Sequence, residues 1–238
     1  MIISNSNKFI FFKPMKTAGT SIEYALSLRY PFTGDDICTG NTENNSLYGD
    51  WGRNMENHYK LSRGRGEHFG PEQLCNYFPM INLGLYKKYT IVRNPWDMMV
   101  SYYWYIHDLH TRYSFDPDCE PLENDDFYTI KRKFNHWMQK QYITRIFKDD
   151  NPGLERPFQT VARINEPMAS IADQYIRFEN LQEDAKNNFG IPFSLPHFKS
   201  GLKRIKRNYR DYYEANSYLV REIKNHFPNT VFKGKYIF

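Results

Sequence analysis

Two polar turns, each directly after an apolar run, carry the residue types that bind phosphate. The first contains a lysine, a glycine and three hydroxyl groups, in the run Lys16-Thr17-Ala18-Gly19-Thr20-Ser21. The second begins at Arg93 and continues to Ser101. Ammonium and guanidinium groups pair with phosphate oxygens, and glycine lets the backbone approach a ligand closely. Both turns therefore predict the binding of an anion such as a phosphate group.

The first turn differs from the loop that binds nucleoside triphosphates with Mg²⁺. That loop places its lysine after the second glycine, directly before a metal-binding hydroxyl. Here Lys16 precedes Gly19, and the second apolar run ends in Arg93 where a metal-holding aspartate would be expected. We therefore expect a phosphate clamp that requires no metal.

A strand and a helix must position the first turn. Residues 8–12 form a short apolar run typical of a buried strand. Thr20 and Glu23 have the spacing of a capping box, which predicts that a helix begins there. The apolar face of this helix is formed by Ile22, Ala25 and Leu26.

The second turn has the same predicted arrangement. Residues 88–92 form a strand, and Asn94 and Pro95 are typical of a helix start. Inward positions of this helix are Met98, Met99, Tyr102 and Ile106. Pro71 begins a shorter helix that continues to Phe78.

The remaining pattern alternates strands and helices. We expect a strand over 175–178 and helices over 125–148, 181–189 (ended by Gly190) and 211–227 (ended by Pro228). This order predicts an α/β fold with a mostly parallel central sheet flanked by helices and a P-loop-like nucleotide-binding core. We expect one domain over 1–238, with an irregular polar excursion at about 30–67. Ligands of such sheets bind beyond the carboxyl ends of the strands, where both turns lie.

At the level of motifs, the sequence resembles the sulfotransferases that use 3′-phosphoadenosine 5′-phosphosulfate (PAPS) as donor, and most closely the carbohydrate-sulfating branch. The run from Lys16 to Ser21, preceded by Pro14, resembles the 5′-phosphosulfate loop of that family, although Met15 stands where proline often precedes the lysine. Val92-Arg93-Asn94-Pro95-Trp96-Asp97, continuing to Ser101, resembles its 3′-phosphate motif. The two motifs in this order are more specific than either alone.

The resemblance implies a role for each matching residue. Lys16 would contact the oxygen that bridges sulfate and phosphate, and the residues from Thr17 to Ser21 (Thr17, Ala18, Gly19, Thr20 and Ser21) would hold the 5′-phosphate. Arg93 and Ser101 would bind the 3′-phosphate. PAPS would be the donor co-substrate, and the acceptor would be a hydroxyl group, which we expect to belong to a carbohydrate.

An acceptor hydroxyl attacks poorly unless a base removes its proton, and histidine is competent near neutral pH. His68 is our candidate, because the segment from Glu67 to Glu72 resembles the one that carries the histidine of the carbohydrate-sulfating branch. Glu67 is the alternative base.

A basic run near the C-terminus also suits an anion. It comprises Lys199, Lys203, Arg204, Lys206, Arg207 and Arg210, and Lys203 and Arg207 are the best candidates for cofactor binding because they are one helical turn apart. A solvated helix face explains the run equally well. Trp51 and Tyr48 are candidate acceptor contacts.

Composition excludes several classes. With 40% hydrophobic and 25% charged residues in 238, the chain is neither disordered nor fibrous. No apolar run is long enough for a membrane span, and the first residues lack a secretory pattern, so we expect a cytoplasmic protein without a membrane partner. The net charge of +5 suits an anionic ligand without requiring nucleic acid. A nucleic-acid-binding module and a catalytically inactive nucleotide-binding relative remain the alternatives.

Overall fold

Short apolar runs build the central sheet. The computed structural model describes residues 1–30, 36–38, 68–108, 118–144, 153–192, 194–195, 207–213 and 218–238. Its sheet has five strands in the order β3-β1-β2-β4-β7, and these are β1 (Ile2–Ser4), β2 (Phe9–Phe11), β3 (Ile37–Cys38), β4 (Lys87–Val92) and β7 (Gln174–Arg177). The expected strands over 8–12, 88–92 and 175–178 are confirmed as β2, β4 and β7, with small shifts at their ends.

The sheet is mixed, rather than mostly parallel as expected. β2 pairs in parallel with β4, and β4 with β7, whereas β1 pairs antiparallel with both β2 and β3. No strand was expected over the first residues, yet Ile2 and Ile3 are buried and pair in register with Phe11 and Ile10. A turn through residues 5–8 then reverses the chain and makes β1 and β2 a hairpin.

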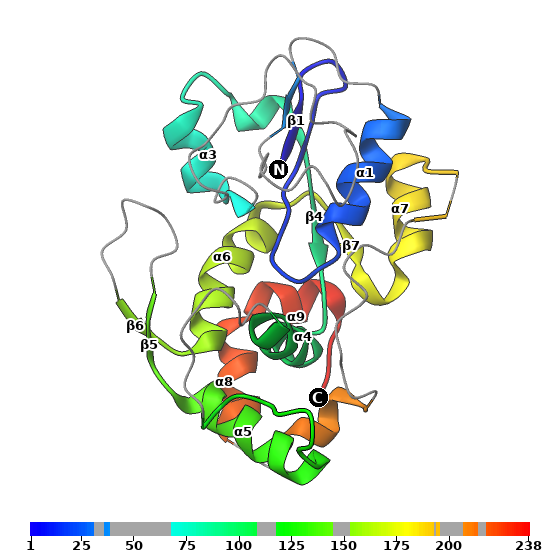
Figure 1. The fold of residues 1–238 in the computed structure, drawn as a ribbon. Helices are drawn as coiled ribbons and strands as arrows, with labels where there is room; N and C mark the ends of the chain where they lie inside the picture. The colour runs from blue at the N-terminus through cyan, green and yellow to red at the C-terminus, as the bar shows by residue number, and fades with distance from the viewer. Residues whose placement is uncertain are drawn as a thin grey trace. The chain divides into compact units, whose positions relative to one another are not determined.

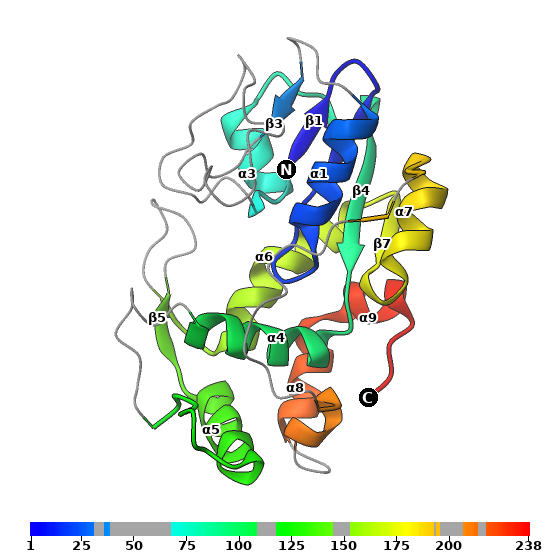
Figure 2. The same ribbon diagram turned by 45° about the vertical axis from the view of Figure 1, so that its right-hand side comes forward.

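Both faces of the sheet are buried at β1 and β2. On one face, side chains of β2 and β4 pack against α1 (Gly19–Arg29) and α7 (Leu181–Phe189), and the rings of Tyr89 and Phe189 lie 4.4 Å apart. Ile10 and Phe12, which alternate with these side chains along the chain, are also fully buried. Figures 1 and 2 show α3 (Pro71–Tyr77) on the opposite side of the sheet from α1 and α7.

The contacts of the chain divide it into two compact units, each with its own apolar core. We call Met1–Val92 with Ile164–Phe198 the sheet unit, and Arg93–Arg163 with Lys199–Phe238 the helical unit. Helix α6 (Pro157–Ile171) passes from the helical unit into the sheet unit after Arg163. The expected single domain over 1–238 stays a prediction.

The helical unit has an aromatic core. Its elements are α4 (Pro95–Asp108), α5 (Phe127–Gln139), the first turns of α6, α8 (Tyr218–His226), α9 (Pro228–Gly234), the short 3₁₀ helix η5 (Tyr209–Tyr212) and the antiparallel pair β5 (Tyr142–Thr144) and β6 (Gly153–Glu155). Tyr103, Phe134 and Trp137 are buried together, with ring centroids 5.3 to 6.2 Å apart. The inward positions expected on α4 are confirmed, with Met98 and Met99 buried and Tyr102 and Ile106 packed against this core.

Two helix boundaries were predicted wrongly. The helix expected over 125–148 ends at Gln139, and the chain then enters β5. The helix expected over 211–227 is the shorter α8, and Pro228, expected to end the final helix, is the first residue of α9. Proline fits the first helical position because its missing N–H is not needed there. The helix over 181–189 is confirmed, and Gly190 ends it with a φ of 62°.

The remaining elements of the sheet unit are short. They are the 3₁₀ helices η3 (Leu83–Leu85), before β4, and η4 (Phe178–Asn180), between β7 and α7. Among the helices of the described ranges, none has both the length and the apolar character needed to cross a membrane.

Candidate functional site

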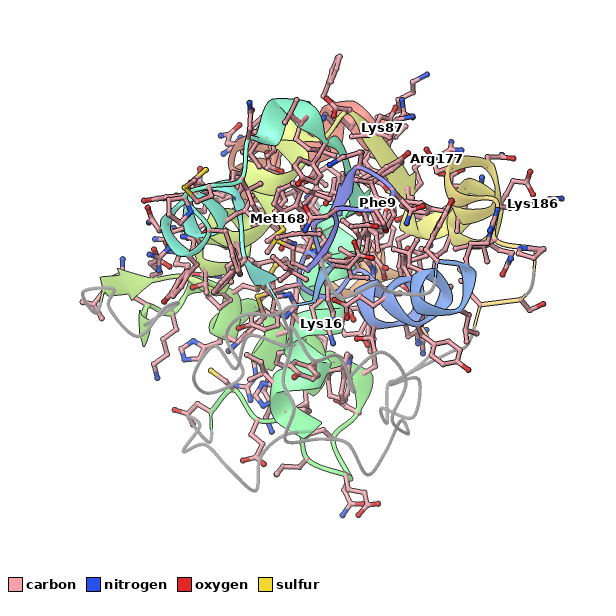
Figure 3. The ribbon with its side chains drawn as sticks, turned by 90° about the horizontal axis from the view of Figure 1, so that it is seen from above. Phe9, Lys16, Lys87, Met168, Arg177 and Lys186 are labelled. Atoms are coloured by element: carbon pink, nitrogen blue, oxygen red, sulfur yellow. The ribbon has the colours of Figure 1, made fainter. Side chains whose placement is uncertain are left out.

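The loop between β2 and α1 lies at the end of the sheet toward which β4 points (Figure 1). It carries Lys16, which Figure 3 labels where the loop approaches α1. Lys16 and Ala18 both have positive φ, 59° and 61°. This backbone conformation costs a non-glycine residue on the order of 1 kcal/mol or more, so neighbouring contacts must hold it.

Helix α1 begins without a side-chain cap. Its N-cap residue is Ala18, which has no capping side chain, and its first turn contains no acidic residue. The first N–H groups of a helix have no acceptor within the helix, and its N-terminus carries a partial positive charge. Such a helix start favours an anion. The capping box expected from Thr20 and Glu23 is wrong, because the N-cap is Ala18, two residues before Thr20, and the helix starts at Gly19.

Glu23 instead forms a buried ion pair with Lys13, which the sequence analysis did not single out. Lys13 Nζ lies 2.6 Å from Glu23 Oε2, and both side chains are less than a tenth exposed. The other carboxylate oxygen of Glu23 lies 3.0 Å from the Met1 nitrogen. The stem of Lys13 passes so close to Gly19 that a Cβ there would lie 2.4 Å from Lys13 Cγ. Glycine at this position is therefore a packing requirement of the ion pair.

The hydroxyl groups expected at the 5′-phosphate differ in their surroundings. Thr17 is buried, and its hydroxyl donates to the carbonyl oxygen of Pro14 at 3.0 Å, so its proton is used to close the loop. Ser21 is also buried, whereas Thr20 is half-buried. Of the three side chains, that of Thr20 is the best placed to reach a ligand from solvent.

Asn165 of α6 clamps the residue before Lys16. Its Oδ1 accepts from the backbone N–H of Met15 at 2.8 Å, and its Nδ2 donates to the carbonyl oxygen of Met15 at 3.2 Å. The Asn165 side chain is buried. The sequence analysis missed both this residue and α6, and no spacing in the sequence connects positions 15 and 165.

His68 lies against the same loop. Its Nδ1 lies 2.8 Å from the carbonyl oxygen of Lys13. Because a carbonyl oxygen can only accept, Nδ1 carries the proton of this hydrogen bond, and in the neutral ring Nε2 is the unprotonated nitrogen. The His68 side chain is half-buried. The structure thus places the expected base beside the expected phosphate loop, within the sheet unit. Glu67 lies outside the described residues.

The turn after β4 belongs to the helical unit and is held by its own residues. Asn94 Oδ1 accepts from the N–H groups of Trp96 and Asp97, which confirms the expected helix cap. Arg93 is 6% exposed, and its Nε and one terminal nitrogen donate to a single oxygen of Asp97 at 2.9 and 2.7 Å. Ser101, farther along α4, is half-buried.

A buried phenol supports this turn. The hydroxyl of Tyr213 donates to the carbonyl oxygen of Trp96 at 2.9 Å, and Asn94 Nδ2 donates to the hydroxyl of Tyr209 at 3.2 Å. Burial, together with the nearby charge of Asp97, raises the pKa of Tyr213 well above its ordinary value. Tyr213 therefore stays a neutral donor over the physiological pH range.

Most of the basic run lies outside the described residues, including Lys203. Arg207 is exposed, and its guanidinium lies 4.9 Å from the ring centroid of Phe127. Arg210 is stacked near the rings of Tyr209 and Phe238. Trp51 and Tyr48 also lie outside the described part of the chain.

Comparison with protein-family models gave no match, and comparisons with curated proteins and with solved structures gave no significant match. Within the described ranges, no group of three or more His, Cys, Asp or Glu side chains is arranged to hold a metal ion. The expected independence of metal stays a prediction.

Proposed function

We propose that the protein is a sulfotransferase that moves a sulfuryl group from PAPS to a hydroxyl acceptor, which we expect to belong to a carbohydrate. The observation that carries the proposal is the hydrogen bond between His68 and Lys13. It joins a candidate base to the loop that carries a candidate phosphate-binding lysine, although 55 positions separate the two residues.

The residues of the loop have roles that suit this reaction. The N-terminus of α1 and Lys16 stabilise the negative charge that builds on the 5′-phosphate as it leaves. Nε2 of His68 takes the proton of the acceptor hydroxyl while the new oxygen–sulfur bond forms and the bond from sulfur to the phosphate oxygen breaks. The electron pair of the broken bond stays on the phosphate. The products are a sulfate ester, 3′-phosphoadenosine 5′-phosphate (PAP) and a proton.

Binding of PAP tests the nucleotide half of the proposal. Titration calorimetry in the presence of a chelator should detect PAP binding, and Lys16→Ala should weaken it. Lys186→Ala, which changes an exposed lysine of α7, is the matched control. Binding of ATP with Mg²⁺ in the absence of PAP binding would instead favour a kinase-like protein.

Transfer of labelled sulfate tests the catalytic half. With an acceptor found by screening, Lys16→Ala should lower turnover by about a hundredfold or more, the usual cost of losing a donor to a developing oxyanion. His68→Ala should lower turnover by roughly a hundredfold or more, whereas His136→Ala, in an exposed position of α5, should not. Unchanged turnover in His68→Ala would remove His68 as the base. PAP binding without transfer to any acceptor would favour the inactive relative.

The roles of Arg93 and Ser101 at the 3′-phosphate stay predictions. They are tested by comparing PAP with AMP, which lacks that phosphate. Arg93→Ala should weaken the binding of PAP and leave that of AMP unchanged. Equal losses for the two nucleotides would exclude a specific role for Arg93 at the 3′-phosphate.

A further inference from the structure

The buried amide of Asn165 binds the backbone of Met15, the residue before Lys16. Both polar atoms of this amide are used there, at 2.8 Å to the N–H and 3.2 Å to the carbonyl oxygen of Met15. An N–H can only donate and a carbonyl can only accept, so the contacts themselves fix which amide atom is Oδ1 and which is Nδ2. Asn165 thus binds both the N–H and the carbonyl oxygen of Met15, as a residue of a neighbouring strand does in a hydrogen-bonded pair.

The second of these hydrogen bonds determines a backbone angle of Lys16. The carbonyl group of Met15 and the N–H of Lys16 belong to one planar peptide group, and no described peptide bond is cis. Holding the carbonyl oxygen of Met15 fixes that plane, and the orientation of the plane relative to the Lys16 Cα sets the φ of Lys16. This φ is 59°, a value that a lysine does not favour by itself.

Other contacts close the loop on both sides of Met15 but do not act on this peptide group. Thr17 donates to the carbonyl of Pro14, and His68 binds the carbonyl of Lys13. Neither contact restrains the peptide plane between Met15 and Lys16, so neither of them does what the bond from Asn165 does.

We propose that Asn165 is a positioning residue, which holds Lys16 in its left-handed conformation and so directs the lysine toward the 5′-phosphate. This inference rests on the proposed function for the identity of the ligand. It does not need the ligand for its structural part, because the conformation of Lys16 is measurable in the protein alone.

The informative substitution is Asn165→Asp. The ionised carboxylate keeps an acceptor for the N–H of Met15 but sets an acceptor against its carbonyl oxygen, which removes the bond that fixes Lys16. Protonation of the carboxyl restores a donor in the same place. Asn165→Leu has a similar size and loses both hydrogen bonds at every pH.

Asn135→Leu is the matched control. Asn135 is also a buried asparagine whose Nδ2 donates to backbone carbonyls, those of Lys131 and Tyr212, both at 2.8 Å. It lies in the helical unit, on α5. Its substitution should lower stability by a similar amount without acting on Lys16.

The experiment measures two quantities for each variant. Amide hydrogen exchange by NMR reports on the backbone from Met15 to Ala18, and calorimetry reports on PAP affinity between pH 5 and 8. We expect faster exchange in this segment for N165D and N165L, and PAP affinity weaker by roughly tenfold, the size of one buried hydrogen bond. Relative to wild type, the affinity of N165D should recover as pH falls, and that of N165L should not. N135L should show neither change.

Each outcome decides one question. If wild type binds PAP but N165D and N165L bind it within about twofold of wild type, Asn165 does not position Lys16 for the ligand. If wild type does not bind PAP, the proposed function fails, and the exchange rates alone decide the structural part. Unchanged amide exchange rates from Met15 to Ala18 in both variants would show that Asn165 does not hold the conformation of Lys16. If N165L does not fold, N165D and its pH dependence give the same decision.

Discussion

The turns after β2 and β4 share the order strand, turn and helix, but different kinds of contact hold them. In the turn after β4, Asn94 caps α4 and Arg93 pairs with Asp97 four positions on, and Tyr209 and Tyr213 add support from distant positions. The turn after β2 leaves α1 uncapped. Besides the local bond from Thr17 to Pro14, it is held by His68 and Asn165, 55 and 150 positions away from their partners.

A third turn resembles the one after β4. Arg177, the last residue of β7, donates through two guanidinium nitrogens to the two carboxylate oxygens of Asp184 in α7, both at 2.9 Å. Thus at the ends of two of the three parallel strands an arginine is paired with an aspartate of the following helix. The turn after β2 also contains an ion pair, between Lys13 and Glu23, but its helix start has no side-chain cap. This difference agrees with the proposed role of the β2–α1 loop at the 5′-phosphate.

The largest effect on stability should come from crowding the β2–α1 loop. In Gly19→Ala the new Cβ meets Lys13 Cγ, an atom near the base of a buried, ion-paired side chain that has little room to move. We expect a loss of about 1–3 kcal/mol in the free energy of unfolding, measured by urea titration. Gly84→Ala, in an exposed position of η3, is the control. A loss of the same size in both would mean that Lys13 does not crowd Gly19.

A smaller loss should follow from removing the local cap of the other turn. Asn94→Ala deletes the acceptor for two N–H groups of α4 and should cost about 1 kcal/mol in urea titration. Asn94→Asp keeps an acceptor and should lose less. If the two variants were equally destabilised, the contact with Tyr209, and not the cap, would be the important one.

The pairing of Arg177 with Asp184 in the third turn should make the stability of the protein depend on pH. Burial alone would raise the pKa of Asp184, but hydrogen bonds from Arg177 and Asn180 outweigh it and hold the pKa below its ordinary value. The resulting stability is complete above the unfolded-state pKa of about 3.8 and is lost as the pH falls through the lower folded-state value. Melting temperatures from pH 7 to pH 2 should therefore fall less steeply in Asp184→Asn than in wild type. Parallel curves would contradict this.

The smallest expected effect is a gain in stability. Ala18→Gly relieves a positive φ but makes the unfolded chain more flexible, so the net stabilisation should be a few tenths of a kcal/mol. Thermal unfolding measures it. A clear loss of stability would mean that the methyl group of Ala18 makes packing contacts worth more than the strain it causes.

Local chemistry explains which parts of the fold were predictable from the sequence. The cap at Asn94 and the left-handed end of α7 at Gly190 depend on neighbouring residues, and both were predicted correctly. The capping box at Thr20 was wrong, because α1 begins earlier, with Ala18 as its N-cap, and the Glu23 side chain pairs with Lys13, a buried contact that local spacing does not reveal. Helix α6 was missed, and Pro167 interrupts its sequence pattern.

The residues of the candidate site also differ in whether the local sequence reveals them. The Lys16 loop and His68 were identified by motif, and the structure brings them together in the sheet unit. Asn165 could not be identified, because a bond between a side chain and a distant backbone leaves no spacing to recognise. The expected role of Thr17 at the 5′-phosphate stays a prediction, and its hydroxyl donates to the carbonyl oxygen of Pro14.

The approach of Lys13 to Gly19 also limits how this chain can vary through evolution. The lysine stem fills the volume that any larger residue at position 19 would need. In descendants of this sequence, a side chain at 19 should therefore be accompanied by a shorter residue at 13. Glu23 should stay acidic after such a change, because its other carboxylate oxygen still pairs with the Met1 nitrogen at 3.0 Å. Positions 13 and 19 should thus change together.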